Sequence, residues 1–84
     1  MTPDEIKSIL IEGLENAEVM ADGDGSHFQV IAISNQFDGL RPVRRQQLIY
    51  GLLGEHITSG ALHALVIKTY TEAEWKSAKK LQVG

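Results

Sequence analysis

The sequence contains no cysteine. This absence excludes disulfide bonds, zinc sites built from thiolates, a catalytic thiol, and an iron–sulfur cluster held only by this chain's own thiolates. No apolar run approaches the roughly 20 residues that a helix needs to cross a membrane. The first residues, Met1 to Glu5, do not form a signal peptide. Together these absences predict a soluble, cytoplasmic protein.

Aromatic residues and basic charge are both scarce. Phe, Trp and Tyr make up 6% of the chain and are scattered along it, so they do not form a platform on which bases could stack. The 8 basic residues are outnumbered by 11 acidic ones, and the net charge of −3 argues against a surface built to clamp a polyanion. No Ser–His–Asp set, catalytic carboxylate pair or phosphate-binding glycine loop is recognisable. We therefore do not expect an enzyme.

What is present is a globular composition on a chain of one-domain length. The 84 residues are 43% hydrophobic and 23% charged, which predicts a single domain over residues 1–84 with one thin core. Capping boxes at Thr2–Glu5 and Thr71–Glu74 each predict the start of a helix. The apolar periodicities predict the order α-β-β-α-β-α, with a helix after Thr2, strands at 17–21 and 27–34, a helix at 42–53, a strand at 61–70 and a final helix after Thr71.

The connections between these elements predict how the strands pair. Residues 22–26 are turn formers, so a hairpin is expected to join the first two strands in antiparallel fashion. A helical crossover usually returns the following strand parallel to its predecessor. We therefore expect an α/β (α+β) fold with a three-stranded mixed sheet. All three helices should pack on one face of it, through Ile9, Leu14, Leu48, Leu52 and Trp75.

Two of the three histidines open predicted strands. If the second and third strands are parallel, His27 and His63 stand at the same end of the sheet, where two neutral imidazoles could bind zinc, copper or iron. The alternative is that both are half-exposed side chains hydrogen-bonded to the backbone. Two ligands are too few to hold a metal unaided, so this site needs a partner. The third histidine, His56, falls in a predicted polar link and is expected to be solvated.

Three arginines cluster at the start of the predicted second helix. Arg41, Arg44 and Arg45 follow an i, i+3, i+4 spacing. Cations are disfavoured at a helix N-terminus, so their presence suggests a compensating anion such as a phosphate. The alternative is pairing with the chain's own acids, of which Asp38 is nearest in sequence. Arg45 lies one turn before the apolar stripe, and we expect it to tie helix to loop.

Several spaced motifs run from the predicted hairpin to the last helix. They are His27-Phe28-Gln29-Val30, Phe37-Asp38-Gly39, Arg45 followed by Leu48-Ile49-Tyr50, His63-Ala64-Leu65, and Thr69-Tyr70-Thr71 with Glu74-Trp75. Together these motifs resemble the BolA family, and the resemblance covers nearly the whole chain. It implies a compact BolA-like domain similar to the second type of KH fold.

The same resemblance implies a partner and a cofactor. BolA-like proteins pair with monothiol glutaredoxins and share a [2Fe–2S] cluster, to which the glutaredoxin and its glutathione contribute thiolates and the BolA-like chain a histidine. His63 matches that histidine. The family's second ligand, a Cys or His in the loop between the first strands, has no direct counterpart here, which leaves His27 or Asp24. No cluster is expected on this chain alone.

The sequence therefore predicts a non-enzymatic adaptor in iron–sulfur handling and stress response, monomeric alone or a weak homodimer. The alternative is a nucleic-acid-binding regulator that uses a KH-like surface with Arg41, Arg44 and Arg45. That role is the weaker candidate, because the chain is acidic and carries Arg45-Gln46-Gln47 where many relatives have Arg-His-Arg. The glycine–x–x–glycine string at 51–54 spells a KH loop, but its central leucines belong to the apolar stripe.

Overall fold

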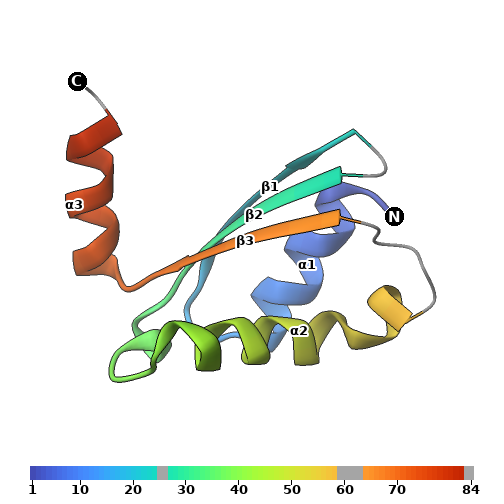
Figure 1. Cartoon of the computed structure of the whole chain (residues 1–84), viewed down its shortest axis with the longest axis horizontal. Coiled ribbons are helices and arrows are strands. Elements are labelled where there is room, and N and C mark those ends of the chain that lie inside the picture. Colours follow the sequence, from blue (N-terminus) through green and yellow to red (C-terminus); the bar gives the residue numbers. More distant parts are fainter. Residues whose placement is uncertain (25–26, 59–63, 83–84) are drawn as a thin grey trace.

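The structure, a computed structural model, describes residues 1–24, 27–58 and 64–82. Helices and strands follow the predicted order, with one additional short 3₁₀ helix before the second α-helix (Figure 1). The elements are α1 (Pro3–Gly13), β1 (Glu18–Gly23), β2 (His27–Ile33), η1 (Asn35–Phe37), α2 (Pro42–Thr58), β3 (Ala64–Tyr70) and α3 (Glu72–Gln82). Among the described residues, no helix is long and apolar enough to cross a membrane.

The predicted capping box at α3 is confirmed, and of the one at α1 the bond to the Thr2 hydroxyl is present. The Thr2 hydroxyl accepts a hydrogen bond from the Glu5 backbone N–H at 3.2 Å, and Pro3 occupies the first turn of α1. At α3 the bonds are reciprocal. The Glu74 N–H donates to the Thr71 hydroxyl at 3.2 Å, and the Thr71 N–H donates to the Glu74 carboxylate at 2.8 Å. These side chains satisfy backbone donors that have no partner within the helix, which is why both helices begin there.

The sheet has the predicted mixed pairing. Its strand order is β1-β2-β3, with β1 and β2 antiparallel and β2 and β3 parallel. The parallel register places His27 opposite Ala64 and Gln29 opposite Val66. Because β2 and β3 run in the same direction, both strands begin at the same edge of the sheet.

The hydrophobic core lies between one face of the sheet, here called the inner face, and the helices α1 and α2. Side chains alternate along β2 as predicted: Phe28, Val30 and Ala32 are buried against the helices, whereas His27 and Gln29 are exposed. The opposite, outer face carries the exposed Val66 of β3. The buried cluster comprises Ile6, Leu10, Leu14, Val19, Phe28, Val30, Ala32, Phe37, Ile49, Leu53 and Ile67.

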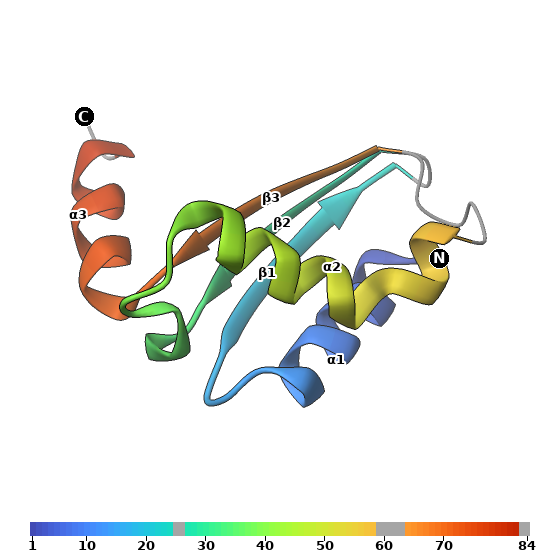
Figure 2. The same ribbon diagram turned by 60° about the horizontal axis from the view of Figure 1, so that its bottom comes forward.

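The third helix does not join this layer, so the prediction that all three helices pack on one face is wrong for α3. In Figure 1, α1 and α2 lie together below the sheet, and in Figure 2 α2 crosses in front of the strands; in both views α3 stands apart from these two helices, beyond the ends of the strands. Trp75 is absent from the buried cluster. Its ring packs against that of Tyr70 in a tilted arrangement, with centroids 5.1 Å apart, and it lines a cavity with Ile33. Ile33 belongs to the outer face and is only 3% exposed. Only Thr71 separates β3 from α3, so the end of the strand sets where the helix starts.

The second helix is longer than predicted. It continues to Thr58 and contains Gly54 and His56, which were expected to lie in a polar link. Ile49 and Leu53 are buried and Ile57 packs against the same cluster, so the four-residue period continues past Gly54. Burial of this stripe outweighs the roughly 1 kcal/mol that a glycine costs within a helix. The glycine–x–x–glycine string therefore lies inside α2 and forms no loop.

Candidate metal-binding site

His27 is the first residue of β2 and its side chain is exposed. The backbone of His27 is fixed by the residues that follow it, because Phe28 is buried in the core and β2 is paired with a strand on each side. The imidazole itself projects from the edge of the sheet, with 74% of its side-chain surface accessible. A side chain placed in this way has a fixed backbone and a reactive group that another molecule can reach.

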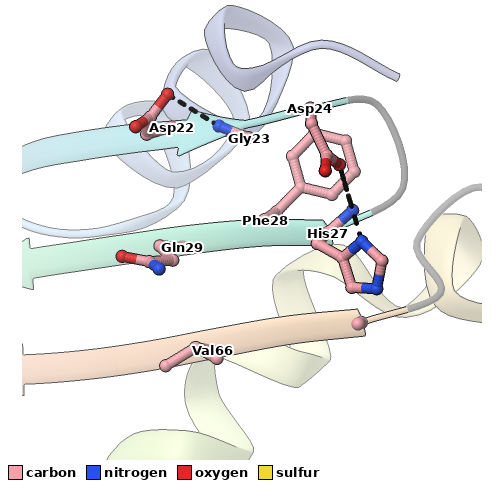
Figure 3. A pocket seen from close by; sticks show the side chains of 8 residues that line it. Asp22, Gly23, Asp24, His27, Phe28, Gln29 and Val66 are labelled. Atoms are coloured by element: carbon pink, nitrogen blue, oxygen red, sulfur yellow. Dashed lines mark hydrogen bonds and ion pairs between the residues drawn. The ribbon is translucent and has the colours of Figure 1, made fainter.

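Asp24 lies next to His27 across the hairpin. Its Oδ1 accepts a hydrogen bond from the His27 backbone N–H at 2.9 Å, and the same oxygen lies 3.6 Å from Nδ1 of the imidazole (Figure 3). The Asp24 N–H in turn donates to the His27 carbonyl at 3.1 Å. Residue 24 is therefore bonded to residue 27 through both backbone and side chain, and its carboxylate faces one of the two ring nitrogens.

An open cavity of about 460 Å³ surrounds this pair. It is formed where the hairpin meets the beginnings of β2 and β3. Gly23 permits the tight approach of the strands here, because a Cβ on that residue would lie 2.5 Å from the Phe28 ring and 2.6 Å from the His27 carbonyl oxygen. The lining residues are Asp22, Gly23, Asp24, His27, Phe28, Gln29, Ala64 and Val66.

The other predicted ligand, His63, lies outside the described residues. The parallel pairing of β2 and β3, on which its association with His27 was based, is confirmed, and the register sets Ala64 directly opposite His27. Within the described part of the chain, no group of three or more His, Cys, Asp or Glu side chains could hold a metal ion. The described residues by themselves would therefore not complete a metal site at this edge.

His56 does not lie in a polar link. It occupies the last turn of α2 and is half-buried, so the expectation of a solvated loop residue is wrong. The reason is the continuation of the helix past Gly54, which carries His56 along with it. It belongs to a different element from His27 and does not line the cavity around that residue.

The three arginines do not converge on one site. Arg45 points to α3, where its guanidinium forms a two-point ion pair with Glu74 at 2.6 and 3.3 Å, and only 11% of its side chain is exposed. Its Nε donates to the Leu40 carbonyl at 2.9 Å, which confirms that it ties helix to loop. The alternative of pairing with an acid is thus correct for Arg45, although the acid is Glu74 and not Asp38. Arg41 and Arg44 are exposed and form no ion pair within the part of the chain that the structure describes.

The contacts of three residues could not be predicted from the sequence. Asp24 was considered only as a possible second ligand and Gly23 only as a turn residue, and their contacts with His27 depend on how the hairpin closes. Gln46 was noted only as a departure from a family pattern. Its side-chain amide donates to the Ile67 carbonyl at 3.0 Å and joins α2 to β3. For Asp24 and Gly23 the sequence offered one signal, which is that a segment of turn-forming residues precedes a histidine at the start of a strand.

Comparison with known proteins agrees with this fold. The family model of BolA-like proteins matches residues 8–74. The chain is 49% identical over 81 residues to the acid stress protein IbaG of Escherichia coli strain K12, covering 96% of each chain. Its fold matches a BolA homologue from Coxiella burnetii with a TM-score of 0.80, 38% identity and coverage of 90% and 97% of the two chains. BolA1 from Arabidopsis thaliana matches with a TM-score of 0.76, 33% identity and coverage of 86% and 93%.

Proposed function

The chain belongs to the BolA-like family, and from this premise we propose that it is a non-enzymatic, cytoplasmic adaptor in iron–sulfur handling and stress response. The proposed partner is a monothiol glutaredoxin, with which the chain would share a [2Fe–2S] cluster. The name of the relative IbaG, an acid stress protein, supports the link to stress. Alone, the chain is expected to be a monomer or a weak homodimer.

The observation that carries this proposal is the exposed imidazole of His27 at an open cavity beside the start of β3. Imidazole nitrogen is a competent ligand for iron, and a [2Fe–2S] cluster can carry two histidines in place of two thiolates. The described residues offer this imidazole and nearby carboxylates, and the chain has no thiolate. The donor set therefore fits a shared cluster and does not fit one held by this chain alone.

The roles of the chain's own residues follow from their positions. His63, the residue before Ala64 in the sequence, would be the first ligand, as the family resemblance implies. His27 would be the second, presented by a strand that the core holds in place. The thiolates would come from the glutaredoxin and its glutathione. A histidine ligand raises the reduction potential of an iron–sulfur centre relative to thiolate ligation, which suits a cluster that is passed on.

Anaerobic cluster reconstitution with a monothiol glutaredoxin tests the proposal. Visible spectroscopy and native mass measurement should reveal a mixed-ligand cluster in a heterodimer. His63→Ala should abolish or alter that spectrum, His27→Ala should have a smaller or comparable effect, and His56→Ala should have none. An unaltered heterodimer spectrum from the His63→Ala protein would overturn the ligand assignment.

A nucleic-acid-binding regulator is the second candidate function. One observation favours it: Arg41 and Arg44 are exposed and lack ion pairs among the described residues. Phosphate contacts make binding fall steeply with salt. Titration of duplex and single-stranded DNA at low and moderate salt, with the wild type and with Arg44→Glu, decides the matter. Weak binding that Arg44→Glu leaves unchanged would eliminate this function.

A further inference from the structure

The two nitrogens of the His27 imidazole have different surroundings. Nδ1 lies 3.6 Å from Oδ1 of Asp24, whereas Nε2 points away from that carboxylate (Figure 3). A neutral imidazole carries its proton on only one nitrogen and uses the other to bind a metal. A carboxylate beside Nδ1 attracts an N–H and repels a lone pair. The surroundings therefore favour the form with the proton on Nδ1.

We propose that Asp24 is a positioning residue that holds the His27 imidazole in its Nδ1-protonated form, so that Nε2 is the nitrogen presented to a partner's metal. This inference rests on the proposed function. It describes how His27, the proposed second ligand, is prepared to bind the metal. Histidines that bind metals commonly direct their other N–H toward a carboxylate, which fixes the tautomer and the ring orientation.

The hairpin explains why this carboxylate stays in place. Oδ1 of Asp24 also accepts the His27 backbone N–H at 2.9 Å, so the side chain is anchored by the residue whose ring it faces. The Asp24 N–H donates to the His27 carbonyl, which closes the hairpin around the pair. Gly23 has no room for a side chain beside that carbonyl. The Asp24 carboxylate is thus fixed beside the imidazole before any metal arrives.

The neighbouring Asp22 provides a matched control. It belongs to the same hairpin and lines the same cavity, but its Oδ1 accepts the Gly23 backbone N–H at 2.8 Å and is not paired with His27. Asp22→Asn and Asp24→Asn each remove one negative charge and keep an amide oxygen for the backbone hydrogen bond. Only the second change removes the charge that faces Nδ1.

Nitrogen-15 NMR of the imidazole tests the inference without any cluster. At a pH where ordinary histidines are neutral, the wild-type His27 spectrum should be that of the Nδ1-protonated form. Asp24→Asn should shift it toward the Nε2-protonated form, and Asp22→Asn should leave it unchanged. Backbone amide shifts of β1 and β2 should stay the same in both variants, which separates a change of tautomer from a loss of the hairpin.

A second measurement connects the tautomer to the metal. In reconstitution with glutaredoxin, Asp24→Asn should lower the yield or stability of the mixed-ligand cluster by about tenfold, in the range found for other residues that orient metal ligands, and Asp22→Asn should not. A wild-type spectrum of the Nε2-protonated form, or an Asp24→Asn spectrum identical to wild type, would overturn the inference and leave the adaptor function intact. Failure of the wild-type pair to form any shared cluster would instead refute the proposed function.

Discussion

Arg45 and Glu74, which are 29 positions apart in the sequence, form a two-point ion pair between α2 and α3. Nη1 lies 2.6 Å from Oε1 and Nη2 lies 3.3 Å from Oε2. The same Glu74 carboxylate accepts the Thr71 backbone N–H at the start of α3. A second link joins Asn35 to Glu72. The Asn35 side-chain amide donates to the Glu72 carboxylate at 3.0 Å, and the Glu72 backbone N–H donates to Oδ1 of Asn35 at 3.1 Å. The helix that stands outside the main layer is therefore attached at its first turn by polar contacts.

Removing the charge of Glu74 should loosen this attachment. We expect Glu74→Gln to lower the free energy of unfolding by about 1 kcal/mol, less than is usual for charged hydrogen bonds, because nearly half of the Glu74 side chain is exposed. Urea unfolding at neutral pH measures the loss. The control is Glu12→Gln, because Glu12 is an exposed acid on α1. The free energy of unfolding of this variant should stay within about 0.5 kcal/mol of wild type. Equal effects of the two changes would contradict a structural role for the pair.

The same pair predicts how stability depends on pH. The hydrogen bonds from Arg45 and then from the Thr71 backbone hold the pKa of Glu74 below its ordinary value of 4.5. Because the folded pKa lies below the unfolded one, this contribution is complete above the unfolded value and is lost as the pH falls through the folded value. The stability difference between wild type and Glu74→Gln should therefore be constant from neutral pH down to about pH 5 and shrink below 4.5. Urea unfolding across this range tests it, and a difference that persists in full at about pH 3 would contradict it.

Two glycine substitutions should change stability in opposite directions. A Cβ at Gly23 would meet the Phe28 ring and the His27 carbonyl oxygen at about 2.5 Å, and a backbone oxygen cannot move away cheaply. We expect Gly23→Ala to cost about 1–3 kcal/mol through overpacking. Gly51→Ala, within α2 and with no atom inside 4 Å, should instead stabilise by about 0.5–1 kcal/mol. Thermal unfolding of both variants measures this, and a neutral Gly23→Ala would show that the hairpin can adjust.

The proposed glutaredoxin partner, if bound at His27, would also lie beside Val66, because both residues line the same cavity. Val66 lines the cavity there and is 53% exposed, whereas Val43 on α2 is 60% exposed and lies outside that cavity. We expect Val66→Glu to weaken glutaredoxin binding by about tenfold, equivalent to about 1.4 kcal/mol. Val43→Glu should leave it unchanged. Calorimetric titration of the two variants compares them, and an equal loss in both would place the docking surface elsewhere.

Local signals in the sequence predicted much of the fold. Thr2 and Thr71 marked the helix starts because their hydroxyls bond to donors only three positions away. The alternation of Phe28 and Val30 with polar neighbours assigned the two faces of β2 correctly. The candidate site was predicted in part: His27 does open a strand at the edge shared by β2 and β3, but the contact with Asp24 required the closed hairpin.

The sequence by itself determined the order of the elements, the mixed pairing of the sheet and the exposure of His27, because periodicity, capping and the crossover rule act over short stretches of chain. Tertiary structure alone decided three things: the end of α2 at Thr58, the place of α3 and the pairing of Arg45 with Glu74. The first depends on whether burial of Ile57 outweighs a glycine in the helix. The place of α3 and the pairing of Arg45 depend on which side chains come into contact where β3 ends near the start of α2. A pair such as Arg45 and Glu74 has no local signature, since its stability arises only after the elements that carry it have packed.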